Sequence, residues 1–252
     1  MRSRWVSLSP PRRFMRDLLR FAAAVPSIPV QRRMNLGAVA AARAAAPERP
    51  GWPAVFLKGY ALVCRDVPAL RRAFVRLPWP HLVEYPASVA AVAVERDYSG
   101  EPAVFFGRIK DPAAAPLHEL HAQVRGFAAR PLREVRAFRE VLHLAALPAV
   151  LRRAAIWLGL NLPRLRSHHF GTFGLSTYSS LGAESLHPIS PVTSTLTYGP
   201  IDRDGRVDVR VIYDHRVLDG ATVARALARL EETLNGPVLA ELRDAAHLRR
   251  AG

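Results

Sequence analysis

The sequence predicts one α/β domain in which a mixed sheet is flanked by helices. Helix-like and strand-like segments are mixed along the whole chain, which is typical of α/β and α+β domains. Residues 207–215 alternate between apolar and polar side chains with a period of two, as a strand does. The 252 residues, of which 50% are hydrophobic, are enough for one large core. Neither repeats nor a low-complexity linker divide the chain, so we expect a single domain over residues 1–252.

The first quarter of the chain is expected to be mostly helical, because apolar residues recur at helical spacing between arginines. Prolines mark the breaks in this pattern. We expect a helix over 12–24, a strand over 28–36, an alanine-rich helix over 38–46, a loop over 46–53, and a helix over 54–75 that is broken near Pro68.

The pattern then changes to a hairpin and back to helices. The valine- and alanine-rich residues 82–94 suggest a strand buried on both faces. The turn signal Ser99-Gly100 precedes a second strand over 104–109. A helix is expected over 117–129. Residues 133–163 are predicted to form a helical insertion rich in arginine and apolar residues.

Strand character returns from Phe170, before the final helix. A strand-like stretch is expected over 170–180, directly after His168-His169, and a second strand over 191–199. A turn at Arg203-Asp204-Gly205 leads into the alternating strand over 207–215. The final helix is expected to start near Asp219 and to stop at Asn235-Gly236-Pro237.

The strong positive charge of the chain does not by itself indicate nucleic acid binding. Lysine and arginine together number 36 against 21 acidic residues, which gives a net charge of +15. Only Lys58 and Lys110 are lysines, so the charge reflects a general arginine bias rather than a basic patch. Because no basic run alternates with aromatic residues, we do not expect a nucleic acid partner. The arginines suit anionic phosphate groups on a small ligand.

Cysteine and histidine usage gives no sign of a metal or redox site. Cys64 is the single cysteine, and its apolar surroundings favour a buried hydrophobe over a nucleophile. His118 and His121 are three apart on a predicted helix, but no third ligand is suitably spaced. The pair at 168 and 169 would point to opposite faces of a strand. We therefore expect no metal.

The N-terminus has no apolar stretch of signal-peptide length. The most apolar segment, residues 141–163, is interrupted by Pro148 and by two arginines, so it is too short to span a membrane. It suits contact with a membrane surface or with the apolar patch of a partner. The sequence therefore predicts a cytoplasmic protein that can contact a membrane peripherally.

The most informative stretch is YDHRVLDGAT, residues 213–222, between the last strand and the last helix. Backbone on both sides would fix His215, which suits a general base. Asp219 lies at the helix start, where a carboxylate gains from the helix dipole and can cap free amides. Gly220 allows close approach of another chain or a ligand. The alternative is that His215 pairs with Asp214 or Asp219 and only stabilises the turn.

A family resemblance favours the catalytic interpretation. The segment DHRVLDG, residues 214–220, resembles the DHRxxDG signature of dihydrolipoamide acyltransferases, the catalytic cores of 2-oxo acid dehydrogenase complexes. It is also similar to the HxxxDG pattern of chloramphenicol acetyltransferase, which shares their fold. The resemblance covers most of the chain through GTF at 171–173, SSLG at 179–182, HPISP at 187–191, RRFMRDLLRF from Arg12 and FLKGYALVCRDVPAL from Phe56.

The resemblance implies a fold, a reaction and an assembly. The fold would be the two-layer sandwich of chloramphenicol acetyltransferase. His215 would deprotonate a dihydrolipoamide-like thiol or another small acceptor, which then attacks a coenzyme A thioester, and a serine hydroxyl would stabilise the oxyanion. Asp219 would hold the turn, with Asp214, Arg216 and Gly220 in support. The active site would lie between subunits of a homotrimer, with histidine and serine on different chains.

The identity of that serine stays open at the level of sequence. Alignment on GTF selects Ser176, whereas alignment on SSLG selects Ser179, because extra residues separate the two anchors. The spacing to HPISP favours Ser176. Either serine could also be an ordinary strand residue whose hydroxyl bonds a neighbouring carbonyl.

Two departures from the family bear on function. Neither a lipoyl domain nor a subunit-binding domain is expected, so no covalent lipoyl group is predicted on this chain. The insertion at 133–163 is longer and more apolar than its counterpart in the family. These features predict a free-standing catalytic domain whose acceptor need not be lipoamide. The alternative is an inactive trimeric scaffold, or a membrane-surface module, of the same fold.

Overall fold

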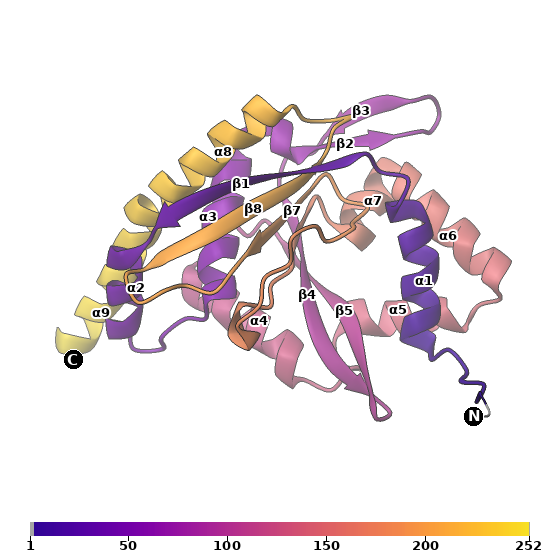
Figure 1. The fold of residues 1–252 in the computed structure, drawn as a ribbon, viewed down its shortest axis with the longest axis horizontal. Coiled ribbons are helices and arrows are strands. Elements are labelled where there is room, and N and C mark those ends of the chain that lie inside the picture. Colours follow the sequence, from indigo (N-terminus) through magenta and orange to yellow (C-terminus); the bar gives the residue numbers. More distant parts are fainter. Residues whose placement is uncertain (1–2, 252) are drawn as a thin grey trace.

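The computed structural model describes residues 3–251, and the side chains of residues 3–245. Its helices surround one large sheet (Figure 1). The strands are β1 (Ser27–Asn35), β2 (Arg72–Val75), β3 (His81–Glu84), β4 (Val89–Tyr98), β5 (Glu101–Lys110), β6 (Phe173–Leu175), β7 (Ser194–Tyr198) and β8 (Arg206–Asp214). The helices are α1 (Pro10–Ala22), α2 (Gly37–Ala45), α3 (Trp52–Asp66), α4 (Leu117–Ala129), α5 (Arg136–Ala146), α6 (Ala149–Asn161), α7 (Pro163–Phe170), α8 (Gly220–Thr233) and α9 (Leu239–Ala251).

The large sheet is six-stranded and mixed, in the order β1-β8-β7-β6-β4-β5. The central pairs, β7 with β6 and β6 with β4, are parallel. The outer pairs are antiparallel. Strands β2 and β3 form a separate two-stranded sheet. This arrangement confirms the predicted mixed sheet with flanking helices.

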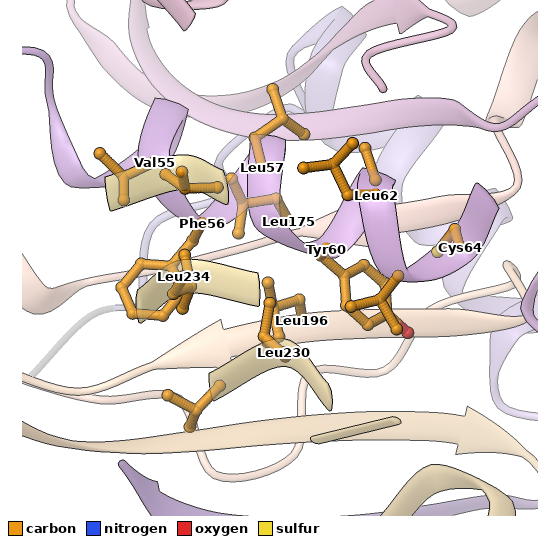
Figure 2. Close-up of a cluster of buried hydrophobic side chains, with 14 of the residues drawn as sticks. Val55, Phe56, Leu57, Tyr60, Leu62, Cys64, Leu175, Leu196, Leu230 and Leu234 are labelled. Carbon is orange, nitrogen blue, oxygen red and sulfur yellow. The ribbon is translucent and has the colours of Figure 1, made fainter. Parts of the chain in front are cut away.

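One face of the sheet carries the main hydrophobic core. Helix α3 lies across this face beside α8, and nearly every side chain from Ala54 to Cys64 is buried there. Figure 2 shows α3 residues packed between Leu175 and Leu196 of the sheet and Leu230 and Leu234 of the C-terminal helical segment. This helix is largely apolar because sheet and helix together enclose it, and its buried Lys58 donates to the carbonyls of Ala113 and Ala115.

The other face of the sheet is hollowed by small residues. Along β4, Ala91 and Ala93 point away from the main core, and Gly174 occupies the adjacent row of β6. Helices α1, α5, α6 and α7 cover this part of the face (Figure 1). Their apolar side chains form a second, smaller core around Phe14, Leu18 and neighbouring residues. The segment 133–163 therefore supplies α5 and α6 to this second core.

A buried ion pair ties α1 to α6. The carboxylate of Asp17 is 1% exposed, and the guanidinium of Arg152, 2% exposed, donates to it from Nε at 2.7 Å. Arg152 also donates to the carbonyl of Leu147 at 2.8 Å, at the junction between α5 and α6. Because both charges are removed from water, each depends on the other for compensation.

Two expected elements near the middle of the chain are wrong in part. The helix expected over 54–75 ends at Asp66, and Pro68 starts a 3-10 turn that leads into β2. The single strand expected over 82–94 is two strands, β3 and β4, which belong to different sheets and are separated by residues 85–88, including Pro86. Sequence periodicity could not detect the β2–β3 pairing, which depends on contacts between short segments.

The expected end of the last helix is also wrong. A π-helical turn, Leu234–Val238, carries the chain through Pro237 into α9. Leu234 and Val238 are fully buried against the main core, and this packing outweighs the preference of proline for a helix end. Likewise, the strand expected from Phe170 begins only at Phe173, and His168-His169 lie on helix α7 rather than on a strand.

Candidate active site

The turn between β8 and α8 is held by the backbone around His215. The His215 N–H donates to the carbonyl of Pro26, at 3.0 Å, which joins the turn to the segment before β1. The N–H groups of Val217 and Leu218 donate to the carbonyl of Asp214. The ring of His215 therefore projects from a fixed base, and it remains 46% exposed to solvent.

A backbone carbonyl determines which ring nitrogen of His215 is free. Nδ1 lies 3.0 Å from the carbonyl oxygen of Leu218. Because a carbonyl oxygen can only accept, Nδ1 carries the hydrogen of the neutral ring. The lone pair is then on Nε2, on the far side of the ring. This is the tautomer and orientation that a general base requires.

Asp214, rather than Asp219, holds the turn together within one chain. Its buried carboxylate accepts from Nε and Nη2 of Arg216, at 2.9 and 2.7 Å, and from the Arg216 N–H at 3.0 Å. The Arg216 guanidinium also stacks 4.5 Å from the ring centre of Phe74. Asp219 is at the N-cap, but its side chain makes no capping hydrogen bond and is 85% exposed. Its nearest oxygen is 3.8 Å from His215 Nδ1.

Gly220 permits close packing at the start of α8. A β-carbon at this position would lie 3.3 Å from the hydroxyl of Tyr213. The rings of Tyr213 and His215 meet edge to face with centres 5.6 Å apart. Gly220 thus leaves room for the tyrosine that borders the histidine.

The structure separates the two serines into different environments. Ser176 directly follows β6, where its N–H donates to the carbonyl of Leu196 at 3.1 Å. It lies on the wall of a cavity of about 870 Å³ on the hollowed face of the sheet. Ser179 instead starts a 3-10 turn, and its hydroxyl lies 3.1 Å from Thr177 Oγ1. Ser179 does not line that cavity.

His215 and Ser176 do not meet within one chain. Tyr213 pairs with Ser194 at one end of β7, whereas Ser176 follows Leu175, which pairs with Leu196 nearer the other end. His215 extends beyond the Ser194 end of β7, whereas Ser176 follows Leu175 and is level with Thr197, near the other end of β7. At about 3.3 Å per strand residue, roughly 15 Å separates them along the strands alone.

The other candidate side chains, Cys64 and His121, have surroundings typical of structural residues. Cys64 is fully buried, and burial raises the pKa of its thiol well above the usual value. His121 Nδ1 accepts from the N–H of Gly51 at 3.1 Å. Within the described residues, no group of three or more His, Cys, Asp or Glu side chains is placed to bind a metal ion. None of the helices described is both long and apolar enough to cross a membrane.

Sequence reasoning missed the residues that support the site from distant segments. The buried guanidinium of Arg166 donates to the carbonyl of Pro191 at 2.7 Å and fixes the loop before β7. Burial lowers the pKa of Arg166, and the charges of Tyr85 and Asp214 oppose this. Pro26 and Phe74 contact the histidine turn from the other side. No local pattern marks these residues, because their partners are far away in the sequence.

Known structures share the architecture of the chain, although no protein-family model and no curated protein sequence matches it. Dihydrolipoamide acetyltransferase from Azotobacter vinelandii superposes with a TM-score of 0.70 at 18% identity, and the match covers 94% of each chain. A probable dihydrolipoamide acetyltransferase from Listeria monocytogenes gives 0.67 at 14% identity, over 92% of this chain and 94% of that one. For chloramphenicol acetyltransferase the TM-score is 0.52 at 13% identity, over 90% and 96%.

The chain has the chloramphenicol acetyltransferase-like fold. The resemblance seen in residues 214–220 is thereby confirmed for the architecture. The match extends over nearly the full length of both chains. At these low identities the comparison establishes the fold, while the chemistry depends on the residues of the site.

Proposed function

We propose that the protein is an acyltransferase that moves an acyl group between coenzyme A and a thiol or another small acceptor. The observation that carries the proposal is the geometry of His215, whose Nδ1 is occupied by the Leu218 carbonyl and whose Nε2 is free at a half-exposed position. The fold shared with two acetyltransferases supports the same reaction class.

The reaction needs one base and one oxyanion donor. His215 Nε2 removes the proton from the acceptor thiol, and the resulting thiolate attacks the carbonyl carbon of the acyl thioester. The carbonyl oxygen gains negative charge and is stabilised by the Ser176 hydroxyl. As the carbon–sulfur bond to coenzyme A breaks, the histidine returns its proton to the departing thiolate. The net charge of +15 favours the approach of the coenzyme A phosphates.

The separation of His215 from Ser176 supports a site built by two chains in a homotrimer. A serine on one subunit can meet a histidine on the next only where the two subunits join. One of the similar structures is the cubic core of a pyruvate dehydrogenase complex, so the fold occurs in symmetric assemblies. We expect Asp219, which is exposed within one chain, to lie near this interface.

The activity is tested by supplying acyl-CoA donors together with dihydrolipoamide and measuring the free coenzyme A thiol and the acylated acceptor. Acceptor-dependent release of coenzyme A is the expected result. If an intact trimer transfers no acyl group to thiol, hydroxyl or amine acceptors, the proposed reaction is wrong and the scaffold alternative is favoured.

The two serines are distinguished by single substitutions. Replacing Ser176 by Ala is expected to lower kcat by about 10²- to 10³-fold, the effect of removing one oxyanion donor. Ser179→Ala is the matched control, and we expect less than about a threefold change because its hydroxyl contacts Thr177. Steady-state kinetics of both variants provide the measurement. The reverse order of effects would transfer the role to Ser179.

Mixing two impaired variants tests whether the site is shared between chains. His215→Ala and Ser176→Ala should each retain about 1% of the wild-type rate or less, but trimers reassembled from an equal mixture should recover about a quarter of the wild-type rate. This fraction follows because each site takes its histidine and serine from two chains chosen at random. Mass measurement by ultracentrifugation confirms the trimer. No recovery in verified mixed trimers would show that the pair is not shared in this way.

A further inference from the structure

The cavity beside Ser176 is far larger than an acetyl group requires. Its volume is about 870 Å³. Water-sized groups occupy roughly 30 Å³ each, so an acetyl group would fill only a small part of it. Cavities of about 300–1,000 Å³ are typical of sites that enclose a whole small-molecule ligand. The cavity therefore has room for a much longer chain.

The wall of the cavity is apolar over most of its area. Helix α1 contributes Phe14 and Leu18, the sheet contributes Ala91 and Phe106, and α5 contributes Leu144. An apolar space of this kind does not hold ordered water, which needs polar partners. An empty cavity also lacks packing contacts, which lowers the stability of the folded protein. These properties suit an occupant made of methylene groups.

The cavity exists because small residues line the floor of the sheet at this point. Ala91, Gly174 and Thr195 lie side by side in one row across β4, β6 and β7. A β-carbon at Gly174 would lie 3.1 Å from Thr195 Oγ1, so larger residues in this row would close the space. The opposite face of the same strands carries Val92 and Leu175, which fill the main core. The hollow is thus confined to one face.

Polar groups are placed where a thioester would sit. The hydroxyl of Thr195 is buried and has no hydrogen-bond partner among the described residues. Its strand partner Gly174 lies two residues before Ser176, and both Thr195 and Ser176 line the cavity. A buried hydroxyl without a hydrogen-bond partner costs free energy. The carbonyl oxygen or sulfur of a ligand thioester would remove that cost by accepting a hydrogen bond from it.

Charged groups occupy another boundary of the cavity. Arg108 of β5 bridges to Glu140 of α5, and His169 Nδ1 lies 3.4 Å from the same carboxylate. Burial raises the pKa of Glu140, but hydrogen bonds from Arg108 and Arg136 outweigh it and lower the pKa to about 2. The cluster of Arg108, Glu140 and His169 therefore connects α5 to the sheet and to α7.

From these observations we propose that the cavity binds the straight hydrocarbon chain of a medium- or long-chain acyl thioester, with its thioester end at Ser176 and Thr195. The inference rests on the proposed function and specifies its acyl donor. The helical segment 133–163 then has a role, because α5 and α6 provide part of the wall. Selection of the acyl group becomes a property of this second core.

Binding of an acyl-CoA series by calorimetry tests the inference without requiring turnover. From acetyl-CoA through hexanoyl- and decanoyl- to myristoyl-CoA, affinity is expected to rise about three- to fourfold per methylene until the cavity is filled. Ala91→Leu and Val104→Trp fill the cavity from two different strands. Each should reduce the ratio of decanoyl-CoA to acetyl-CoA affinity by about tenfold or more. The control, Ala122→Leu on the exposed face of α4, should leave the ratio unchanged.

The possible results separate the two proposals. If affinity rises with chain length but no acyl group is transferred, the proposed function fails and the acyl-chain site stands. If acetyl groups are transferred while affinity is independent of chain length, the acyl-chain site is wrong and the function stands. Folding of each variant is verified by circular dichroism, and an unchanged ratio in a folded filling variant also overturns the inference.

Discussion

Replacing His215 by glutamine is expected to lower kcat for acyl transfer by about 10²- to 10⁴-fold, the usual contribution of a general base. Glutamine is similar in length to histidine and keeps a polar side chain, but it has no basic nitrogen in place of Nε2. The ring is half exposed and the turn is held by Asp214 and Arg216, so the fold should be unaffected. Steady-state rates with saturating acyl-CoA provide the measurement.

The same substitution at an exposed histidine is the control for this result. His118 lies on the exposed surface of α4, and His118→Gln should leave the rate unchanged. Unfolding curves of the two variants should match that of the wild type. An unchanged rate in the His215 variant would remove the base assignment and favour a chemically inactive scaffold.

Replacing Asp17 by asparagine is expected to reduce the free energy of unfolding by about 3–5 kcal/mol. This change leaves the guanidinium of Arg152 buried without its counter-charge. The neighbouring bond from Arg153 Nε, at 3.0 Å, would also be weakened. Urea unfolding at neutral pH measures the difference. Glu101→Gln, which breaks a solvent-exposed pair with Arg12, is the matched control and should leave the urea midpoint nearly unchanged.

The Asp17 interaction also predicts a pH dependence with a defined sign. Burial raises the pKa of Asp17, but hydrogen bonds from Arg153, Arg152 and Arg16 outweigh it and keep the pKa below its usual value. The folded pKa is therefore lower than the unfolded value of about 3.9, so this stabilisation is complete above that pH and is lost as pH falls through the folded pKa. The asparagine variant should lack this part of the acid destabilisation. An identical acid dependence in both proteins would contradict the assignment.

The sequence by itself determined the strand, turn and helix around His215. The alternation over residues 207–215 and the apolar stripe of α8 are local patterns, and the structure reproduces both. The hairpin at Ser99-Gly100 could likewise be predicted from the sequence, because positive φ angles at both residues are a local requirement of the turn. The fold class followed because such segments alternate along the whole chain.

Only the tertiary structure decided how these segments form a site. Asp17 and Arg152 are 135 positions apart, and no sequence pattern pairs them. The carbonyl of Leu218 fixes the tautomer of His215, and the register of three strands separates Ser176 from His215 along the sheet. The cavity exists because helices distant in sequence cover a row of small residues. Periodicity records which side chains are buried, whereas partners, distances and empty space arise only when remote segments pack together.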